Sequence, residues 1–303
     1  AAPDPGQLPV GADVTHGSAG FDRTAQKLTV RQGSERLITE WQDFSIGADA
    51  QVEFIQPSTG SSALNRVTGL RPSEIHGSLT ANGEVLIINP AGIHFASGSH
   101  VDVGALTAST LEMSDADFLS GKRRFSGTGA GKITAEGRIE IGRDGWLTFV
   151  APLVEHRGAI SAPAGTVSMA AGEAVELSLD ADGLVSLKVT RGAIDAAIEN
   201  GGAIDVGNGA VLLNAKGMDT LTRAVVNNSG YIEADGLETE GGRIRLASSG
   251  TVEQSGLVSA DSAQSEGGEI VIEGDEISLG ASSLITATGA TGAGEVLVGG
   301  DWQ

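Results

Sequence analysis

Residues 230–234 read GYIEA and residues 256–260 read GLVSA, so each stretch is a glycine followed by alternating apolar and variable positions. The same pattern occurs at residues 131–135, 158–162 and 202–206, and in a degenerate form at 283–287. Successive copies begin 27, 44, 28, 26 and 27 residues apart. Because strict alternation is typical of a β-strand, the chain repeats one strand at a fairly regular interval.

A second glycine-led element follows the copies of the first at a short distance. It begins at Gly165, Gly209, Gly242, Gly268 and Gly294, and the last three are 26 residues apart. Two strands and two glycine turns in this period fit one coil of a parallel β-helix, in which aliphatic side chains of successive coils stack inside. The strands are not separated by helical patterns, and the period is too short for a propeller blade. We therefore predict an all-β fold, a right-handed parallel β-helix.

Two irregularities in the repeat predict features outside the regular coils. The 44-residue step leaves room for an excursion, and Asp182-Gly183 between two alternating runs predicts a projecting β-hairpin near residues 176–191. The mixed apolar spacing of residues 218–226 indicates one short helix.

The repeat also divides the chain. Residues 1–60 alternate as strands without the coil period, so we expect an N-terminal cap and first strands that cover the open end of the stack. Residues 61–303 are expected to form a single continuous β-helix whose C-terminus is truncated within the solenoid. The opening Ala1-Ala2-Pro3, without a Met, is typical of a mature protein whose signal peptide has been removed.

Composition narrows the function classes. Gly accounts for 45 of 303 residues and aromatic residues for only 4%, which suits a narrow core filled by small aliphatic side chains. The formal net charge of −20 argues against nucleic acid and anionic lipid as partners, since both are bound through Lys and Arg. The chain has no cysteine for a disulfide or a thiolate metal site. No apolar run approaches the length of a membrane span, so we expect no transmembrane segment.

Residues 64–113 combine three strand-sized runs with tight turns. Asn82-Gly83 is typical of a hairpin or of a coil corner, because both residues tolerate positive φ. Asn89-Pro90-Ala91-Gly92 predicts a β-turn, in which Pro90 fixes φ at the second position and Gly92 can adopt a left-handed conformation.

This segment resembles the secretion domain of two-partner secretion exoproteins, also called the filamentous haemagglutinin-type N-terminal domain. The motifs fall in the family's order: NRV at 65–67, SEIHG at 73–77, NGEV at 82–85 and INPAGI at 88–93, with further agreement at 41–47, 105–109, 118–121 and 124–127. The resemblance covers at least residues 7–175. Ala91 stands where the family most often has a second Asn, so a role for that side chain in recognition is absent or dispensable. The Asn-Pro-Asn-Leu motif of some members is missing.

The resemblance implies an N-terminal secretion domain of a large bacterial surface or secreted adhesin, and not an enzyme. Such a domain is recognised in the periplasm by the POTRA domains of an outer-membrane β-barrel transporter and nucleates folding of the β-helix during export. A host or matrix glycan, bound through a missing C-terminal region, is a further implied partner. We expect a monomer without a cofactor.

Eight residues are candidates for transporter recognition or for the structural turns. They are Asn65, Arg66, Asn82, Gly83, Asn89, Pro90, Gly92 and Ile93. Turn chemistry alone explains the Asn, Pro and Gly positions, and direct contact with the transporter is the alternative. The two roles overlap if the chain is recognised while still unfolded.

Other function classes require sites that the sequence does not supply. Polysaccharide lyases with this fold need acidic metal ligands and a basic residue on one face, whereas the acids here are scattered. Neither His94 with His100 nor Asp180 with Asp182 has the pattern of a metal or catalytic site. Lys122-Arg123-Arg124, the only basic cluster, indicates an exposed loop that could meet an acidic partner. A carbohydrate-binding adhesin module and a polysaccharide-active β-helix enzyme remain as alternatives.

Overall fold

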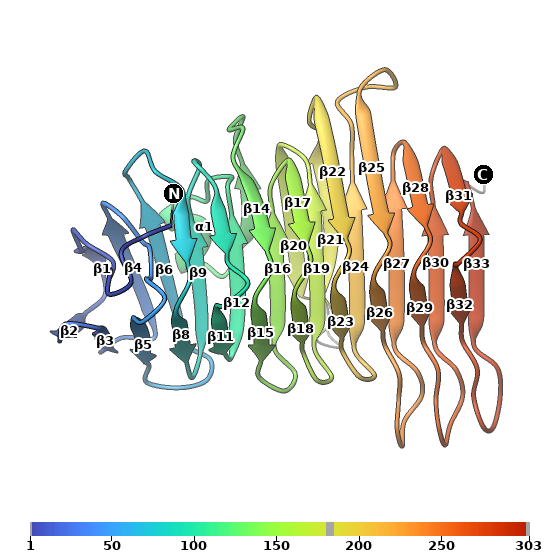
Figure 1. Ribbon diagram of the computed structural model, residues 1–303, viewed down its shortest axis with the longest axis horizontal. Coiled ribbons are helices and arrows are strands. Elements are labelled where there is room, and N and C mark those ends of the chain that lie inside the picture. The colour runs from blue at the N-terminus through green and yellow to red at the C-terminus, as the bar shows by residue number, and fades with distance from the viewer. Residues whose placement is uncertain (1, 180–184, 301–303) are drawn as a thin grey trace.

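The computed structural model describes residues 2–179 and 185–300, and the structural statements below concern these residues. Figure 1 shows an elongated stack of coils whose colour runs from blue at one end to red at the other. Three long sheets, numbered 1 to 3, form its walls. From β7 (Ser73–Ile75) onward, each coil passes through sheet 3, sheet 2 and sheet 1 in that order, as in β7, β8 (Ser78–Ala81) and β9 (Glu84–Ile88). The all-β parallel β-helix predicted from the repeat is confirmed.

Sheets 1 and 2 extend along the whole stack, whereas sheet 3 begins at β7. Sheet 1 contains, in spatial order, β1 (Asp13–His16), β4 (Arg36–Trp41), β6 (Ser62–Val67), β9 (Glu84–Ile88), β12 (Ala105–Ser109), β16 (Trp146–Val150), β19 (Thr166–Ala171), β24 (Ala210–Ala215), β27 (Arg243–Ser248), β30 (Glu269–Glu273) and β33 (Glu295–Gly299). Sheet 2 contains β2 (Ala19–Arg23), β3 (Lys27–Gln32), β5 (Gln51–Ile55), β8 (Ser78–Ala81), β11 (His100–Val103), β15 (Arg138–Ile141), β18 (Ala159–Ser161), β23 (Ala203–Asp205), β26 (Tyr231–Glu233), β29 (Leu257–Ser259) and β32 (Leu284–Thr286). Sheet 3 contains β7 (Ser73–Ile75), β10 (Ile93–Phe95), β14 (Lys132–Ala135), β17 (Leu153–His156), β22 (Asp195–Asn200), β25 (Arg223–Asn228), β28 (Thr251–Gln254) and β31 (Glu276–Leu279).

The register of the strands tests the predicted repeat directly. The second glycine-led element is in register throughout sheet 1, where Thr166 lies beside Ala210 and Ala210 beside Arg243. The first element is in register in sheet 2 from β18 onward, but its copy at residues 131–135 is β14 of sheet 3. The strand next to β18 in sheet 2 is β15 instead. The assignment of residues 131–135 to the same repeated element as residues 158–162 was wrong, because strands of different sheets share the same alternation.

The glycines that open these elements form columns along the stack. A Cβ atom on Gly209 would overlap the carbonyl oxygen of Gly165, and a Cβ on Gly242 would overlap that of Gly209. Gly202 and Gly230 are stacked in the same way in the second column. Only a residue without a side chain allows the backbones to approach so closely, which explains why each element begins with glycine.

Two apolar clusters hold the molecule together. The larger runs inside the coils and is built from alternate strand residues such as Ile160, Ile204 and Ile232. The smaller lies on the outer face of sheet 1 and includes Ile38, Leu86 and Phe118. Sheet 1 is therefore buried on both faces along part of its length, which explains the unbroken apolar run of β9.

A second layer covers this outer face. The predicted hairpin is present as the antiparallel strands β20 (Ala174–Leu179) and β21 (Val185–Arg191), although its turn, with Asp180 and Asp182, lies outside the described residues. β13 (Arg123–Ser126) pairs with β20 to complete sheet 4. The short helix α1 (Asp115–Leu119), which the sequence did not predict, begins after Ser114, whose side chain accepts a hydrogen bond from the backbone of Asp117.

The helix predicted for residues 218–226 is wrong. A turn precedes β25, in which the side chain of Asp219 accepts hydrogen bonds from the backbone N–H groups of Leu221 and Thr222. Leu221 is 95% exposed, whereas Ala224 and Val226 are buried on one face of β25. The apolar residues therefore follow strand alternation after a polar turn, and the short window mimicked a helical spacing.

The N-terminal end of the stack is closed by antiparallel strands. β1 pairs with β4 and β2 with β3, and Phe21 of β2 packs edge-on against Trp41 at a ring separation of 5.8 Å. Parallel pairing already begins between β3 and β5, inside residues 1–60, and β4 pairs in parallel with β6 just beyond them. No helix in the described part of the chain is long and apolar enough to cross a membrane.

Candidate functional site

The turn that contains Asn89, Pro90 and Gly92 connects β9 to β10. The side chain of Asn89 is fully buried and donates to the carbonyl of Arg71 and to Oγ of Ser73, both at 3.0 Å. Its Oδ1 accepts a hydrogen bond from the next residue but one, and its carbonyl accepts one from Gly92, which has a φ of 124°. Asn89 therefore ties this corner to the preceding coil, and glycine is required at position 92.

Asn65 lies inside the coils and not at a corner. Its Oδ1 accepts a hydrogen bond of 2.9 Å from the indole N–H of Trp41, and its amide donates to the carbonyl of Leu86 at 3.1 Å. Trp41 and Asn65 are both 0% exposed. Asn65 thus satisfies a buried indole at the N-terminal end of the core.

Asn82 and Gly83 form the corner between β8 and β9. The exposed Asn82 exchanges two hydrogen bonds with the backbone of Gln56 in the preceding coil, at 2.8 and 3.0 Å. The backbone N–H of Gly83 donates to the buried side chain of Gln56, and a Cβ on Gly83 would contact the carbonyl of Ser61 at 2.6 Å. The dipeptide forms a coil corner and not a hairpin.

The remaining two candidates also have clear structural roles. Arg66 faces outward from sheet 1, donates to the carbonyl of Met113 at 2.8 Å and pairs with Asp115 at 2.8 Å. It thereby fastens the segment before α1 to the stack. Ile93 is buried in the main core. In the folded chain, only Asn82 is classed as exposed among the eight candidates, and Pro90 is half-buried.

Sequence reasoning missed the role of Glu84. This carboxylate is buried, pairs with Arg123 at 2.5 Å and accepts hydrogen bonds from the indole of Trp146 at 2.9 Å and from Ser62 at 2.8 Å. Lys122 and Arg124 are exposed as predicted, but the predicted loop is in part a strand, since β13 begins at Arg123, and Arg123 is partly buried. Arg123 is partly buried because it pairs with the buried Glu84, and no local sequence pattern indicates a partner so distant in the chain.

A groove of about 630 Å³ lies between sheet 1 and sheet 4. Cationic side chains line it together with the indole of Trp146; the cations are Arg36, Lys122, Arg123, Arg124 and Lys188. Arg124 is paired with Asp117, and this pairing lowers the pKa of the aspartate. Among the described residues, cations outnumber acids in the lining, where Glu176 is the one carboxylate, although Arg123 is paired with Glu84 and Arg124 with Asp117.

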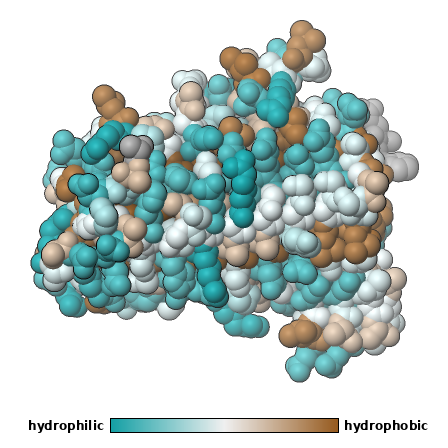
Figure 2. Space-filling model, viewed as in Figure 1, coloured by the Kyte–Doolittle hydropathy of each residue, from teal (hydrophilic) through white to brown (hydrophobic). Residues whose placement is uncertain are grey.

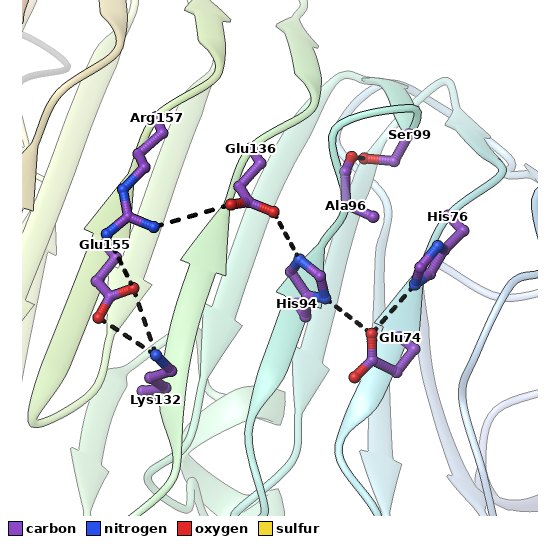
Figure 3. Close-up of polar contacts among 9 residues, drawn as sticks. All are labelled: Glu74, His76, His94, Ala96, Ser99, Lys132, Glu136, Glu155 and Arg157. Carbon is purple, nitrogen blue, oxygen red and sulfur yellow. Dashed lines mark hydrogen bonds and ion pairs between the residues drawn. The ribbon is translucent and has the colours of Figure 1, made fainter. Parts of the chain in front are cut away.

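A row of charged and imidazole groups crosses the outer face of sheet 3 (Figure 3). Glu74 accepts from both His76 and His94, at 3.2 and 2.8 Å, and the second ring nitrogen of His94 lies 3.0 Å from Glu136. Burial alone would lower the pKa of His94, but its hydrogen bonds to Glu136 and Glu74 outweigh burial and raise the pKa. The sequence indicated no metal site for His94 with His100, and the structure keeps these two apart: the coils place His76 beside His94 and leave His100 with Glu140.

The model of the TPS secretion domain matches residues 6–270. The chain belongs to the TPS secretion domain family. This TPS secretion domain is 30% identical over 249 residues to a heme/hemopexin-binding protein of Haemophilus influenzae. The aligned region covers 80% of this chain and 27% of that protein. A second heme/hemopexin-binding protein of that species is 26% identical over 250 residues, 74% of this chain and 26% of that protein. The domain therefore spans about a quarter of the length of these curated relatives.

Solved structures agree with this assignment. The HMW1 secretion domain from Haemophilus influenzae superposes with a TM-score of 0.87 at 29% identity, covering 97% of this chain and 77% of that one. The filamentous hemagglutinin secretion domain superposes with a TM-score of 0.53 at 17% identity, covering 97% of each chain, and supports the fold alone. The recognised motifs of this TPS secretion domain thus belong to a β-helix like that of HMW1.

Proposed function

We propose that this TPS secretion domain directs export of a larger exoprotein and that the periplasmic POTRA domains of an outer-membrane transporter recognise it. The observation that carries the proposal is the family match over residues 6–270. TPS proteins are secreted exoproteins, so the proposed destination is the cell surface or the medium, reached through the periplasm. The matched segment is 27% of one relative and 26% of the other, which supports a function within a longer chain.

The covered N-terminal end of the stack supports a further role in folding. Antiparallel β1 and β2 cover one end. At the other end, large apolar side chains are exposed on the last strands; they are Leu279, Leu284, Val296, Leu297 and Val298. Figure 2 likewise shows hydrophobic surface toward the C-terminal end of the stack. We infer that the domain folds from its covered end and nucleates folding of the β-helix during export.

The burial of the candidate residues separates two modes of recognition. Asn65, Asn89 and Ile93 are buried in the folded domain, so a transporter can contact their side chains only before folding is complete. Asn82 and part of Pro90 remain accessible afterward. We propose that the buried residues act on export through the fold, and that Asn82 and Pro90 lie where a folded domain can be contacted.

Export and folding should be measured separately in cells that co-express the exoprotein with the transporter encoded beside it. We expect export to require the transporter and Asn89→Ala to lower folding yield and export together, whereas Asn82→Ala should fold normally. Export that persists without the transporter would contradict the proposed function. Asn89→Ala protein that folds normally but is not exported would show instead that the transporter reads this side chain directly.

The groove beside sheet 4 favours a second candidate function, the binding of an anionic carbohydrate. Its cations and the indole of Trp146 are groups that bind acidic sugars through charge and stacking. Binding of the purified domain to sulfated or sialylated glycans, weakened at least tenfold by Lys122→Glu with Lys188→Glu, would support it. An array without binding, or binding unchanged in the double variant, would refute it.

We propose no catalytic role, and we propose a monomer. The family match to a secretion domain supports the first proposal. Turnover of acidic polysaccharides that is lost in Glu84→Gln would contradict it. The second is tested by the mass of the domain in light scattering, where a concentration-independent dimer would be the contrary result.

A further inference from the structure

We propose that Glu74, His76 and His94 form a binding site for one divalent transition-metal ion, with Zn²⁺ as the best-matched ion. Glu74 lies on β7, His76 is the first residue after this strand, and His94 lies on β10 of the next coil. The register places Glu74 beside His94, and the alternation of both strands turns these two side chains outward from the core. The site therefore joins two neighbouring coils on the outer face of sheet 3 (Figure 3).

The distances suit tetrahedral coordination. One ligand atom from each of the three side chains lies within 4.8 Å of the other two. Zn–N and Zn–O bonds of about 2.0–2.2 Å at tetrahedral angles require ligand atoms about 3.3–3.6 Å apart. Glu74 Oε2 is 2.8 Å from Nδ1 of His94 and 3.2 Å from Nε2 of His76, so small side-chain rotations are sufficient.

The residue types set the preference among metals. Two imidazoles and one carboxylate are the ligands of many zinc sites, whereas Mg²⁺ and Ca²⁺ prefer oxygen atoms alone. All three side chains are partly exposed, with 22–30% of each accessible. An ion can therefore enter from solvent and keep a water molecule as its fourth ligand.

Glu136 supplies the support that metal-bound histidines usually have. A His94 ring that binds metal through Nδ1 can donate its Nε2–H to Glu136 Oε2, which lies 3.0 Å away. Glu136 in turn is paired with Arg157 at 3.8 Å. When an ion is bound, this second carboxylate would hold the ring in the tautomer and orientation that metal binding requires.

Elsewhere on the surface, the chain offers a matched control. His100 Nε2 lies 2.7 Å from Glu140 Oε2 on neighbouring strands of sheet 2, so it is also a histidine paired with a glutamate across two coils. His100 belongs to no three-ligand group among the described residues. A nonspecific attraction of cations to surface His–Glu pairs should affect both places equally.

The test is calorimetric titration of the whole chain, freed of metal with EDTA, with ZnCl₂. We expect one ion per chain, at least tenfold weaker binding in His76→Ala and His94→Ala, and unchanged binding in His100→Ala. Glu136→Gln should weaken binding by about 10- to 100-fold, as expected for a residue that positions a ligand. Titration with CoCl₂ should give visible absorption bands of tetrahedral cobalt, and MgCl₂ should not compete.

Stability provides a second readout. Because the ion would bridge two coils of the folded state, Zn²⁺ should raise the unfolding temperature of the unmodified chain but not that of His94→Ala. Circular dichroism establishes that each variant is folded, and His94→Gln replaces His94→Ala if the latter is not. The proposal is overturned if the chain does not bind zinc saturably, or if the His94 and His100 variants lose the same affinity.

Discussion

Asn65 is part of a family motif, but it also stabilises the core of the folded domain. Its Oδ1 accepts a hydrogen bond from the indole N–H of Trp41 within the apolar interior, where water cannot replace the asparagine. A buried indole N–H without a partner would carry its full desolvation cost, so the core requires an acceptor such as Asn65 at this position. Family motifs of this kind can therefore reflect folding requirements as well as contact with a partner.

Asn65→Ala should lower the free energy of unfolding by roughly 1–3 kcal/mol, because it leaves the indole of Trp41 unpaired. Urea unfolding followed by tryptophan fluorescence measures this loss. Asn82→Ala is the control, since Asn82 is exposed and water can hydrate the backbone groups that it releases. Equal losses in both variants would contradict the structural role assigned to Asn65.

A buried polar ladder crosses sheet 3 between coils. His156 Nδ1 lies 2.6 Å from Oδ1 of Asn200, Asn200 donates to Asn228 at 2.8 Å, and Asn228 donates to Gln254 at 2.8 Å. All four side chains are at most 1% exposed. Burial lowers the pKa of His156, because a charged imidazole would lose its hydration there, while the hydrogen bond to Asn200 opposes this effect.

This pKa gives the stability a definite pH dependence. As the pH falls below about 6.5, His156 becomes protonated more readily in the unfolded chain than in the folded one, where its pKa is lower. The unfolded state then binds more protons, so the free energy of unfolding falls as the pH decreases from about 6.5 toward the lower folded pKa. His156→Asn continues the ladder without a titrating group and should remove this contribution, whereas His94, whose raised pKa acts in the opposite direction, still contributes. Unfolding measured at several pH values checks it, and parallel profiles would refute it.

At the scale of the element, the glycine columns limit the repeat more strictly than its apolar positions do. Ile, Val and Leu can replace one another in the interior with some repacking, whereas a stacked glycine has no space for any side chain. Gly230 illustrates this restriction, because its Cβ would overlap the carbonyl oxygen of Gly202. The spacing of glycines in the sequence therefore records where successive backbones touch.

Gly230→Ala should destabilise the chain by about 1–3 kcal/mol or more, because the backbones of two coils must move apart. Gly20→Ala is the matched control, since Gly20 also lies in a strand but has no atom within 4 Å of the added Cβ. Denaturant unfolding of the two variants compares them. A Gly230→Ala chain as stable as the Gly20→Ala chain would show that the columns tolerate side chains.

For the whole molecule, stability should vary along the axis of the stack. Each coil contacts its neighbours, so local stability depends on how many neighbours a coil has and how well its apolar residues are covered. Central strands such as β9 and β12 are buried throughout and are further covered by the outer layer, whereas β33 is largely exposed.

Native-state hydrogen exchange measures this gradient directly. We expect amides of β9 and β12 to exchange only by global unfolding and those of β31, β32 and β33 to exchange orders of magnitude faster through local opening. Uniform protection from end to end would contradict the expected additivity and indicate one cooperative unit.

The sequence by itself determined the fold class, because glycine spacing and strand alternation are local properties that each coil repeats. It also determined the hairpin of β20 and β21, through two alternating runs around Asp-Gly, and the family, through ordered motifs between residues 41 and 127. The positions of α1 and β13 did not follow from it. Their apolar residues, such as Phe118 and Phe125, are recognisable only once the outer face of sheet 1 exists to bury them.

Only the tertiary structure decided which side chains meet across coils. The coil length is not constant. The coil from Val101 to its neighbour Ile139 is longer than the coil from Ile139 to its neighbour Ile160, because α1 and β13 are inserted between Val101 and Ile139. Residues far apart in the chain, such as Glu84 and Arg123, or His94 and Glu136, become neighbours through this variable register. Strand pairing fixes the register, and pairing depends on contacts between coils that no single stretch of sequence contains.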